Sequence, residues 1–120
     1  MATAFKNYTA QAIGSTAYYL ISQNSGLFNG GVTSLTSGKA VIMVGLMISN
    51  RLTSSINVDV VHYQTAGSKT TYLAKTFPIP AGDAVEIVQG KIVLGGSDDI
   101  SVVSDTSSSA DVILSILFDA

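Results

Sequence analysis

Two residue types that often carry chemistry are scarce in this sequence: cysteine is absent, and histidine occurs once, at His62. Without cysteine, the chain can form neither disulfide bridges nor thiolate metal sites. A single imidazole leaves only carboxylates for a metal site, and the Gly-x-Ser-x-Gly turn of many serine hydrolases is missing. We interpret His62 as an ordinary strand residue, and we expect a non-enzymatic protein that has no metal or other cofactor.

Charge is also in short supply. Charged residues make up 12% of the 120 residues, whereas an average globular protein has about 25%. The formal net charge is -2, so the surface offers no basic field to phosphates or anionic lipids. We therefore expect neither a nucleic-acid nor a membrane partner. Because hydrophobic residues reach 47%, we expect other chains to cover part of the exterior.

Long hydrophobic runs are missing as well. The longest spans residues 40–48 (AVIMVGLMI), whereas a membrane-spanning helix needs about 20 apolar residues. The stretch MATAFKNYTAQAIG at the N-terminus has no continuous apolar block, so it lacks the layout of a secretory signal peptide. We expect residues 40–48 to form a core strand, and residues 1–15 to form an N-terminal arm or an edge strand.

The residues that are present favour an all-β fold. Short apolar segments alternate with clusters of Gly, Ser, Asn and Asp. Ile56, Val58 and Val60 alternate with polar residues, as expected for a strand with one buried face. The segment 111–118 (DVILSILF) is apolar on both faces, which predicts a central or covered strand.

These patterns predict one domain over residues 1–120, a single antiparallel β-sandwich of the jelly-roll or immunoglobulin-like type with about eight strands. The predicted strands are residues 16–22, 39–49, 55–65, 70–76, 84–88, 91–94, 99–104 and 111–118.

Both prolines lie in the stretch FPIPAGDAVEIVQGKIVL, residues 77–94. Because proline cannot donate to a sheet ladder, Pro78 and Pro80 are expected to end the strand 70–76, with Gly82 at a positive φ in the following turn. A second turn at Gln89-Gly90 predicts a hairpin that joins AVEIV to KIVL, and a third at Gly95-Gly96 leads into DDISVV.

The segment 24–39 (NSGLFNGGVTSLTSGK) is predicted to be a long loop. Its apolar residues Leu27, Phe28 and Leu35 have no periodic place in a strand, so they either fold back onto the core or dock on another subunit. Together with Phe5 near the N-terminus, they are the candidate interface residues.

Acidic residues gather near the C-terminus, at Asp98, Asp99, Asp105 and Asp111. Oxygen-rich loops can bind calcium, but the spacing of an EF-hand is absent. We interpret these aspartates as residues that bond local backbone amides in turns and at strand ends. A carboxylate pair for glycoside hydrolysis would need Glu86 or an aspartate to face another across a cleft, which the sequence does not locate.

Tyr18, Tyr19, Tyr63 and Tyr72 could form a platform on which sugars stack, or could simply pack in a sheet. Neighbouring residues of a strand point to opposite faces, so Tyr18 and Tyr19 cannot share one platform. The chain has no tryptophan, and sheet packing is the favoured interpretation.

The stretch TTYLAKTFPIPAGDAVEIVQGKIVLGGSDDISVVSDTSSSADVILSILF, preceded by VGLMISNRLTSSINVDVVHY, resembles a group of small virion proteins of tailed bacteriophages. The resemblance covers residues 41–118, with a looser echo in TAFKN and AIGST. The chain departs from the group's pattern in the loop 24–39 and in LGGSDD, which leaves the binding surface less defined than the fold.

The resemblance implies a β-sandwich component of the particle, without catalytic residues. The expected function is that of a capsid decoration (cement) protein that stabilises the shell by subunit contacts. A tail, baseplate or fibre-adaptor component is the alternative, and a carbohydrate-binding module is the second alternative. The expected partners are the major capsid protein or tail proteins of the same particle and copies of the chain itself, with a trimer favoured. The expected location is the virion, assembled in the host cytoplasm.

Overall fold

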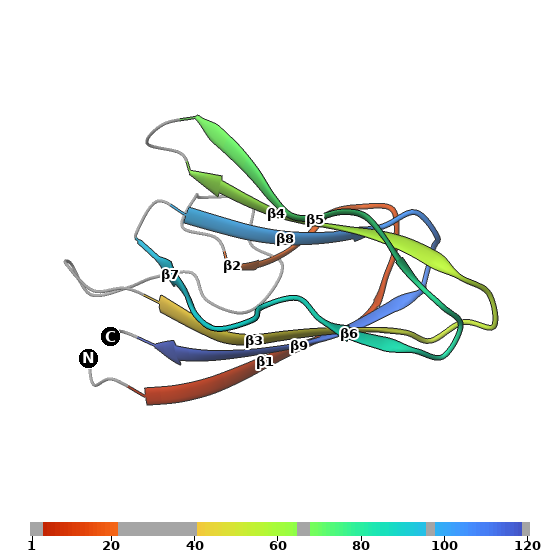
Figure 1. Cartoon of the computed structure of the whole chain (residues 1–120), viewed down its shortest axis with the longest axis horizontal. Helices are drawn as coiled ribbons and strands as arrows, with labels where there is room; N and C mark the ends of the chain where they lie inside the picture. Colours follow the sequence, from red (N-terminus) through yellow and green to blue (C-terminus); the bar gives the residue numbers. More distant parts are fainter. Residues whose placement is uncertain (1–3, 22–40, 65–67, 96–97, 119–120) are drawn as a thin grey trace.

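The computed structural model describes residues 4–21, 41–64, 68–95 and 98–118. These residues form nine strands and no helix, and the strands make two antiparallel sheets that stack face to face (Figure 1). The all-β sandwich predicted from the sequence is therefore confirmed. The strands are β1 (Ala4–Ile13), β2 (Tyr18–Ile21), β3 (Val41–Asn50), β4 (Ile56–Gln64), β5 (Lys69–Ile79), β6 (Ala84–Glu86), β7 (Ile92–Leu94), β8 (Asp98–Ser104) and β9 (Ala110–Phe118).

Sheet A has the strand order β1-β9-β3-β6, and β7 also pairs with β3. Sheet B has the order β2-β8-β4-β5. The first and last strands are neighbours in sheet A, where Ala4 pairs with Phe118. The N-terminal segment is thus an edge strand whose partner comes from the other end of the sequence. Within the described ranges, no helix has the length and apolar character that a membrane span requires.

The core lies between the two sheets and takes alternate residues from each strand. Ile56, Val58 and Val60 of β4 are at most 1% exposed, so the alternation predicted for this strand is confirmed. The last strand, β9, lies between β1 and β3 and is central, as its two apolar faces predicted. Its residues Leu114 and Ile116 are fully buried in the core.

The prolines do not end β5 where the sequence predicted. The strand continues past Thr76, and Pro78 pairs with Asn57 of β4 before the strand ends at Ile79. The prediction was wrong because β5 is an edge strand, and an edge position can tolerate a residue that has no backbone N–H to donate. The turn itself follows at once, with Gly82 at the expected positive φ of 69°.

The predicted hairpin at Gln89-Gly90 is also wrong. The strands β6 and β7 do not pair with each other, because β6 pairs with residues 47–49 of β3 and β7 pairs with residues 41–43 of the same strand. Each has only three residues, too few for a stable isolated hairpin, whereas the ten-residue β3 offers both of them a continuous row of backbone partners. After β7 the chain crosses to sheet B, where Asp98 N–H donates to Gly95 O (3.4 Å).

A buried asparagine joins two turns at one end of the sandwich. Asn50, which is 2% exposed, ends β3. Its Nδ2 donates to the carbonyls of Ser54 (2.7 Å), Ile79 (3.0 Å) and Pro80 (3.3 Å), and its Oδ1 accepts from Leu52 N–H (2.8 Å). One side chain therefore ties the β3–β4 connection to the end of β5, and it satisfies polar backbone groups that water reaches poorly.

Candidate interaction surface

The outer face of sheet A carries a row of apolar side chains that crosses four strands. The register aligns Phe5 of β1 with Leu117 of β9, Leu117 with Ile42 of β3, and Ile42 with Val93 of β7. Phe5 is 79% exposed and Val93 is 64% exposed, while Leu117 and Ile42 are half-buried between them. Side chains that lie opposite one another across neighbouring strands contact each other, so the four form a continuous strip.

Three more exposed apolar side chains lie further along the same sheet. Met47 of β3 and Ile113 of β9 are direct cross-strand partners, and they are 45% and 50% exposed. Val44 is 40% exposed and lies at a bulge, where the register of β3 with β9 shifts between Met43 and Gly45. We call the complete set the apolar face; its members are Phe5, Ile42, Val44, Met47, Val93, Ile113 and Leu117.

The carboxylate of Glu86, beside the apolar face, accepts hydrogen bonds from backbone amides. Glu86 pairs with Met47 across β6 and β3. Its Oε2 accepts hydrogen bonds from Leu46 N–H (2.6 Å) and Val88 N–H (3.1 Å). Hydrogen bonds to an ionised acceptor are among the stronger ones, so this carboxylate stabilises the junction of β3 and β6.

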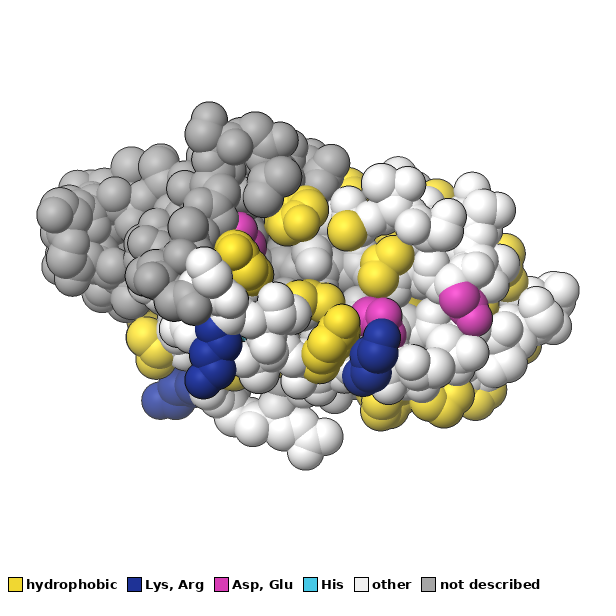
Figure 2. Space-filling view, turned by 90° about the horizontal axis from the view of Figure 1, so that it is seen from above, with side chains coloured by type: hydrophobic (Ala, Val, Ile, Leu, Met, Phe, Trp, Pro, Cys, Tyr) yellow, Lys and Arg dark blue, Asp and Glu magenta, His cyan; other side chains and the backbone are white. Residues whose placement is uncertain are grey.

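The outer face of sheet B has a different character. Figure 2 looks onto this side, and it shows basic and acidic side chains between the hydrophobic ones. Asp59 of β4 accepts from Thr76 N–H (2.6 Å) and lies 3.5 Å from Lys75 Nζ. The same ammonium lies 4.8 Å from the ring centroid of Tyr72, a cation–π distance. Sheet B thus has a charged group over one of its exposed aromatic rings, whereas the side chains of the apolar face lie next to one another in the register of sheet A. The apolar face is therefore the stronger candidate for burial against another chain.

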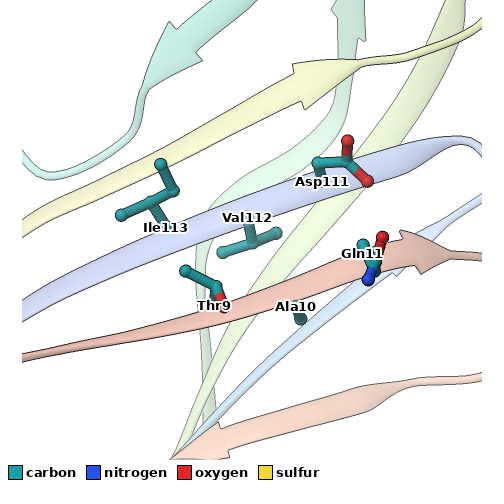
Figure 3. A pocket seen from close by; sticks show the side chains of 6 residues that line it. All are labelled: Thr9, Ala10, Gln11, Asp111, Val112 and Ile113. Carbon is teal, nitrogen blue, oxygen red and sulfur yellow. The ribbon is translucent and has the colours of Figure 1, made fainter.

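A shallow pocket of about 320 Å³ opens over β1 and β9, beside the apolar face. Figure 3 shows Thr9 and Gln11 on β1 next to Ile113 and Asp111 on β9. The Asp111 carboxylate already accepts from Ala12 N–H (2.9 Å) at a bulge of β1 and lies 3.4 Å from the Arg51 guanidinium. This carboxylate holds the bulge in place, and the pocket contains no second charged side chain for a polar ligand.

His62 lies in β4, as the strand interpretation predicted. Its side chain is mostly buried, and Nε2 lies 3.3 Å from Asp98 Oδ2. The two atoms are at ion-pair distance but lack the alignment of a hydrogen bond. Asp98 in turn accepts from Gly95 N–H (3.0 Å), so its carboxylate also closes the turn that leads into β8.

Three of the four aspartates accept hydrogen bonds from backbone amides, but only Asp98 accepts from a local one, as the sequence predicted; Asp105 and Asp111 accept from amides of strands that are distant in the sequence. Asp98 accepts from an amide of the turn before β8, and Asp111 accepts from an amide of β1. Asp105 accepts from Asn57 N–H (3.1 Å) and Asn57 Nδ2 (3.2 Å), and from Thr106 Oγ1 (2.9 Å). The described part of the chain contains no cluster of three or more histidines and carboxylates that could hold a metal ion.

These hydrogen bonds, first of all the one from the Asn57 backbone amide, hold the pKa of the Asp105 carboxyl below its ordinary value of 3.8. A lowered folded-state pKa stabilises the fold at pH values above the ordinary pKa, and this contribution is lost as the pH falls through the folded-state pKa. We therefore expect Asp105→Asn to destabilise the protein at neutral pH and to lose this effect in acid. Urea unfolding of both proteins between roughly pH 7 and pH 2 would test this, and a stability difference that does not change with pH would contradict it.

The four tyrosines lie on three strands of sheet B, and Tyr63 of β4 and Tyr72 of β5 are diagonal neighbours in the register of these two strands. Tyr18 packs against the core, whereas its neighbour Tyr19 belongs to a cross-strand row that runs through Ser101 and Val61 to Tyr72. The opposite directions of Tyr18 and Tyr19 were predicted. Tyr19 and Tyr72 lie on β2 and β5, the two edge strands of the sheet, so two whole strands separate them.

Of the four candidate interface residues, the structure places one. Phe5 lies at the β1 end of the apolar face and is the most exposed of its large side chains. Leu27, Phe28 and Leu35 lie outside the described residues. Sequence reasoning did not single out the other six members of the apolar face. For five of them the signal was the presence of apolar residues on both faces in segments 40–48 and 111–118, whereas Val93 lies outside both segments.

Comparison with known proteins places this chain in no family: no family model matches it, and no curated protein matches it. Among solved structures, the chain is similar to one described as the crystal structure of infectious bursal disease virus VP2 subviral particle. The identity is 10% and the TM-score 0.38, and the match covers 94% of this chain. The chain spans about a third (33%) of the length of that protein.

Proposed function

We propose that this protein is a non-enzymatic structural component of a tailed-phage particle, and specifically a capsid decoration protein that stabilises the shell by subunit contacts. Its partners in this proposal are the major capsid protein and further copies of the chain itself. It acts in the virion, after assembly in the host cytoplasm, and it makes and breaks no covalent bond. The resemblance of residues 41–118 to small phage virion proteins supports the assignment to a phage particle, and the apolar face supports a role in subunit contacts.

The observation that carries the proposal is the apolar face. Seven exposed or half-buried apolar side chains lie together on one side of sheet A. The whole chain has few charged residues, 12% of the total. Removing such a surface from water stabilises a contact by roughly 25 cal/mol per Å² of apolar area. A standard interface buries about 800 Å² per partner, and repetition over a symmetric lattice adds avidity to each contact.

A tail, baseplate or fibre-adaptor role would use the same surface, because it needs the same kind of contact between chains. Copy number separates the two roles. Quantitative protein staining of purified particles should give hundreds of copies for a capsid decoration protein, while a tail ring carries a small multiple of three or six. A count in the lower range would replace decoration by a tail role.

The carbohydrate-binding alternative has less support in the structure. Tyr19 and Tyr72 lie at opposite edges of sheet B. Tyr63 is a diagonal neighbour of Tyr72, but the Lys75 ammonium already lies over the Tyr72 ring. A sugar platform needs aromatic rings that are close together and uncovered. Clear and competable binding on a glycan array would nevertheless favour this function over a structural one.

We expect Val93→Lys to weaken binding to particles by at least about tenfold, because it places a charge without a partner in a contact that excludes water. Val93 is 64% exposed, so the fold itself should tolerate the change. Cosedimentation of the purified variant with particles that lack the protein measures the effect. Thr70→Lys, at an exposed position of β5, is the matched control because it adds the same charge on the other sheet. Equal loss of binding in both variants would argue against the apolar face as the contact surface.

A further inference from the structure

The two sheets end in edge strands that differ in how well they could accept another strand. An open edge presents unpaired backbone groups, and natural proteins usually blunt it with bulges, prolines, charges or short strands. In β5, the register with β4 shifts twice, Thr76 takes a positive φ of 49°, and Pro78 has no N–H. The β5 edge is therefore blunted.

Two further edges are blunted by their shortness. The strand β2 has four residues, and its register with β8 shifts between Tyr19 and Ile21. The strands β6 and β7 at the far edge of sheet A have three residues each and are separated by a non-strand segment. Neither edge offers a long, regular row of backbone groups to another chain.

The edge strand β1 is different. It has ten residues and no proline, and Ala4 to Ala10 pair with β9 in unbroken register before the bulge that precedes Ile13. In the strand order of the described residues, β9 is its only neighbour, so its other side faces no strand of the same sheet. Among the edges formed by the described strands, this is the one that has the length and regularity to add a strand.

We infer that the β1 edge pairs with β1 of a second copy of this chain, antiparallel across a two-fold axis at Asn7. The regular segment that ends at the bulge runs from residue 4 to residue 10, and its midpoint is residue 7. A two-fold axis there is the register that uses the whole regular segment of both copies. Sheet A of one copy would then continue into sheet A of the other.

The side chains of β1 fit this register. On the outer face, Phe5 lies opposite Thr9 of the second copy, so the aromatic ring of the apolar face gains a cross-strand neighbour. On the other face, Lys6 lies opposite Tyr8. An axis at Lys6 would instead place two lysines directly opposite each other, which is unfavourable. An axis at Tyr8 would pair Ala4 with Ala12, and the bulge at Ala12 would interrupt the regular hydrogen bonding.

This pairing goes beyond the proposed function, because its partner is the chain itself and the particle is not needed. A two-fold contact occupies the β1 edge of both copies, so a closed trimer cannot form through this edge. For the purified chain we therefore expect dimers through β1, in place of the trimer favoured from the sequence. The same pairing would join two apolar faces side by side and double the surface that is offered to a particle.

The absence of cysteine makes the register directly testable. Residues that lie opposite each other in an antiparallel pair have Cα atoms about 4.5–5.5 Å apart, within the range that a disulfide spans. Single variants Phe5→Cys, Asn7→Cys and Thr9→Cys, with Thr70→Cys on β5 as a control, would be oxidised mildly at several concentrations. We expect Asn7→Cys to give about tenfold more covalent dimer than the other three. Equal yields in all four, or the highest yield at another position, would overturn the proposed pairing.

A charge at the axis provides a second test without cysteine. Asn7→Lys would place two like charges opposite each other, so we expect the dimer seen by sedimentation velocity to weaken by about tenfold. Thr70→Lys adds the same charge away from β1 and should leave the dimer unchanged, and circular dichroism would verify that both variants are folded. A chain that is monomeric at all concentrations, or a variant that dimerises like the unmodified chain, would overturn the inference. Because no particle is present, neither result bears on particle binding.

Discussion

Replacing Asn50 with alanine should lower the free energy of unfolding by about 3–4 kcal/mol. The side chain is 2% exposed and makes four hydrogen bonds, three as donor to backbone carbonyls and one as acceptor from Leu52 N–H. Alanine would leave these backbone groups without their partner in a region that water reaches poorly, and each such loss costs about 1 kcal/mol or more. Urea unfolding, followed by circular dichroism, measures the change.

The matched control for this prediction is Asn57→Ala. Asn57 is also an asparagine in this part of the chain, but its side-chain amide makes an exposed bond to the Asp105 carboxylate (3.2 Å). We expect this variant to lose less than about 1 kcal/mol. Similar losses in both variants would mean that the connection between the two turns does not depend on Asn50. Asn50→Asp is informative as well: it keeps an acceptor for Leu52 N–H, but it places a carboxylate against the carbonyls of Ile79 and Pro80.

Two leucines of the same strand should separate folding from binding. Leu114→Ala should destabilise the protein by about 2–5 kcal/mol, because Leu114 is fully buried in the central strand β9 and its removal leaves a cavity. Leu117→Ala, three residues further along the strand, removes the same atoms from the half-buried outer side of sheet A. We expect it to cost less than about 1 kcal/mol in stability and to weaken particle binding.

Thermal unfolding and cosedimentation with particles, made on both variants, test this pair. The proposed role of the apolar face requires that Leu114→Ala affects mainly the melting temperature, and that Leu117→Ala affects mainly binding. If Leu117→Ala bound particles normally, the outer side of β9 would not be part of the contact. If it unfolded as readily as Leu114→Ala, its side chain would belong to the core.

The turns show which features can be predicted from neighbouring residues and which depend on distant strands. Gly82 takes the positive φ that the Pro-Ala-Gly sequence predicts, because that conformation depends on a few adjacent residues. The extent of β5 past Thr76 and the partners of β6 and β7 depend on distant strands. A proline is tolerated where the strand is at an edge, and a three-residue strand persists where a long neighbour supplies its hydrogen bonds. Neither condition can be seen in the segment itself.

The apolar face also combines a residue predicted from the sequence with neighbours that only the tertiary structure brings together. Phe5 was picked out as a single apolar residue near the N-terminus, but its row with Leu117, Ile42 and Val93 exists only because β1, β9, β3 and β7 are neighbours. Phe5 and Leu117 are far apart in the chain, and no periodicity relates their positions. The scarcity of charge predicts that some surface is covered, and the strand register determines which exposed apolar side chains lie together.

By itself, the sequence determined the all-β class, the inward face of β4 and the turn at Gly82, because alternation and turn chemistry are properties of a few consecutive residues. Only the tertiary structure decided which strands pair and which exposed apolar residues meet. Distant segments compete for the same hydrogen-bond partners and for buried area. The pairing with the lowest free energy therefore depends on the whole sandwich and cannot be read from a single strand.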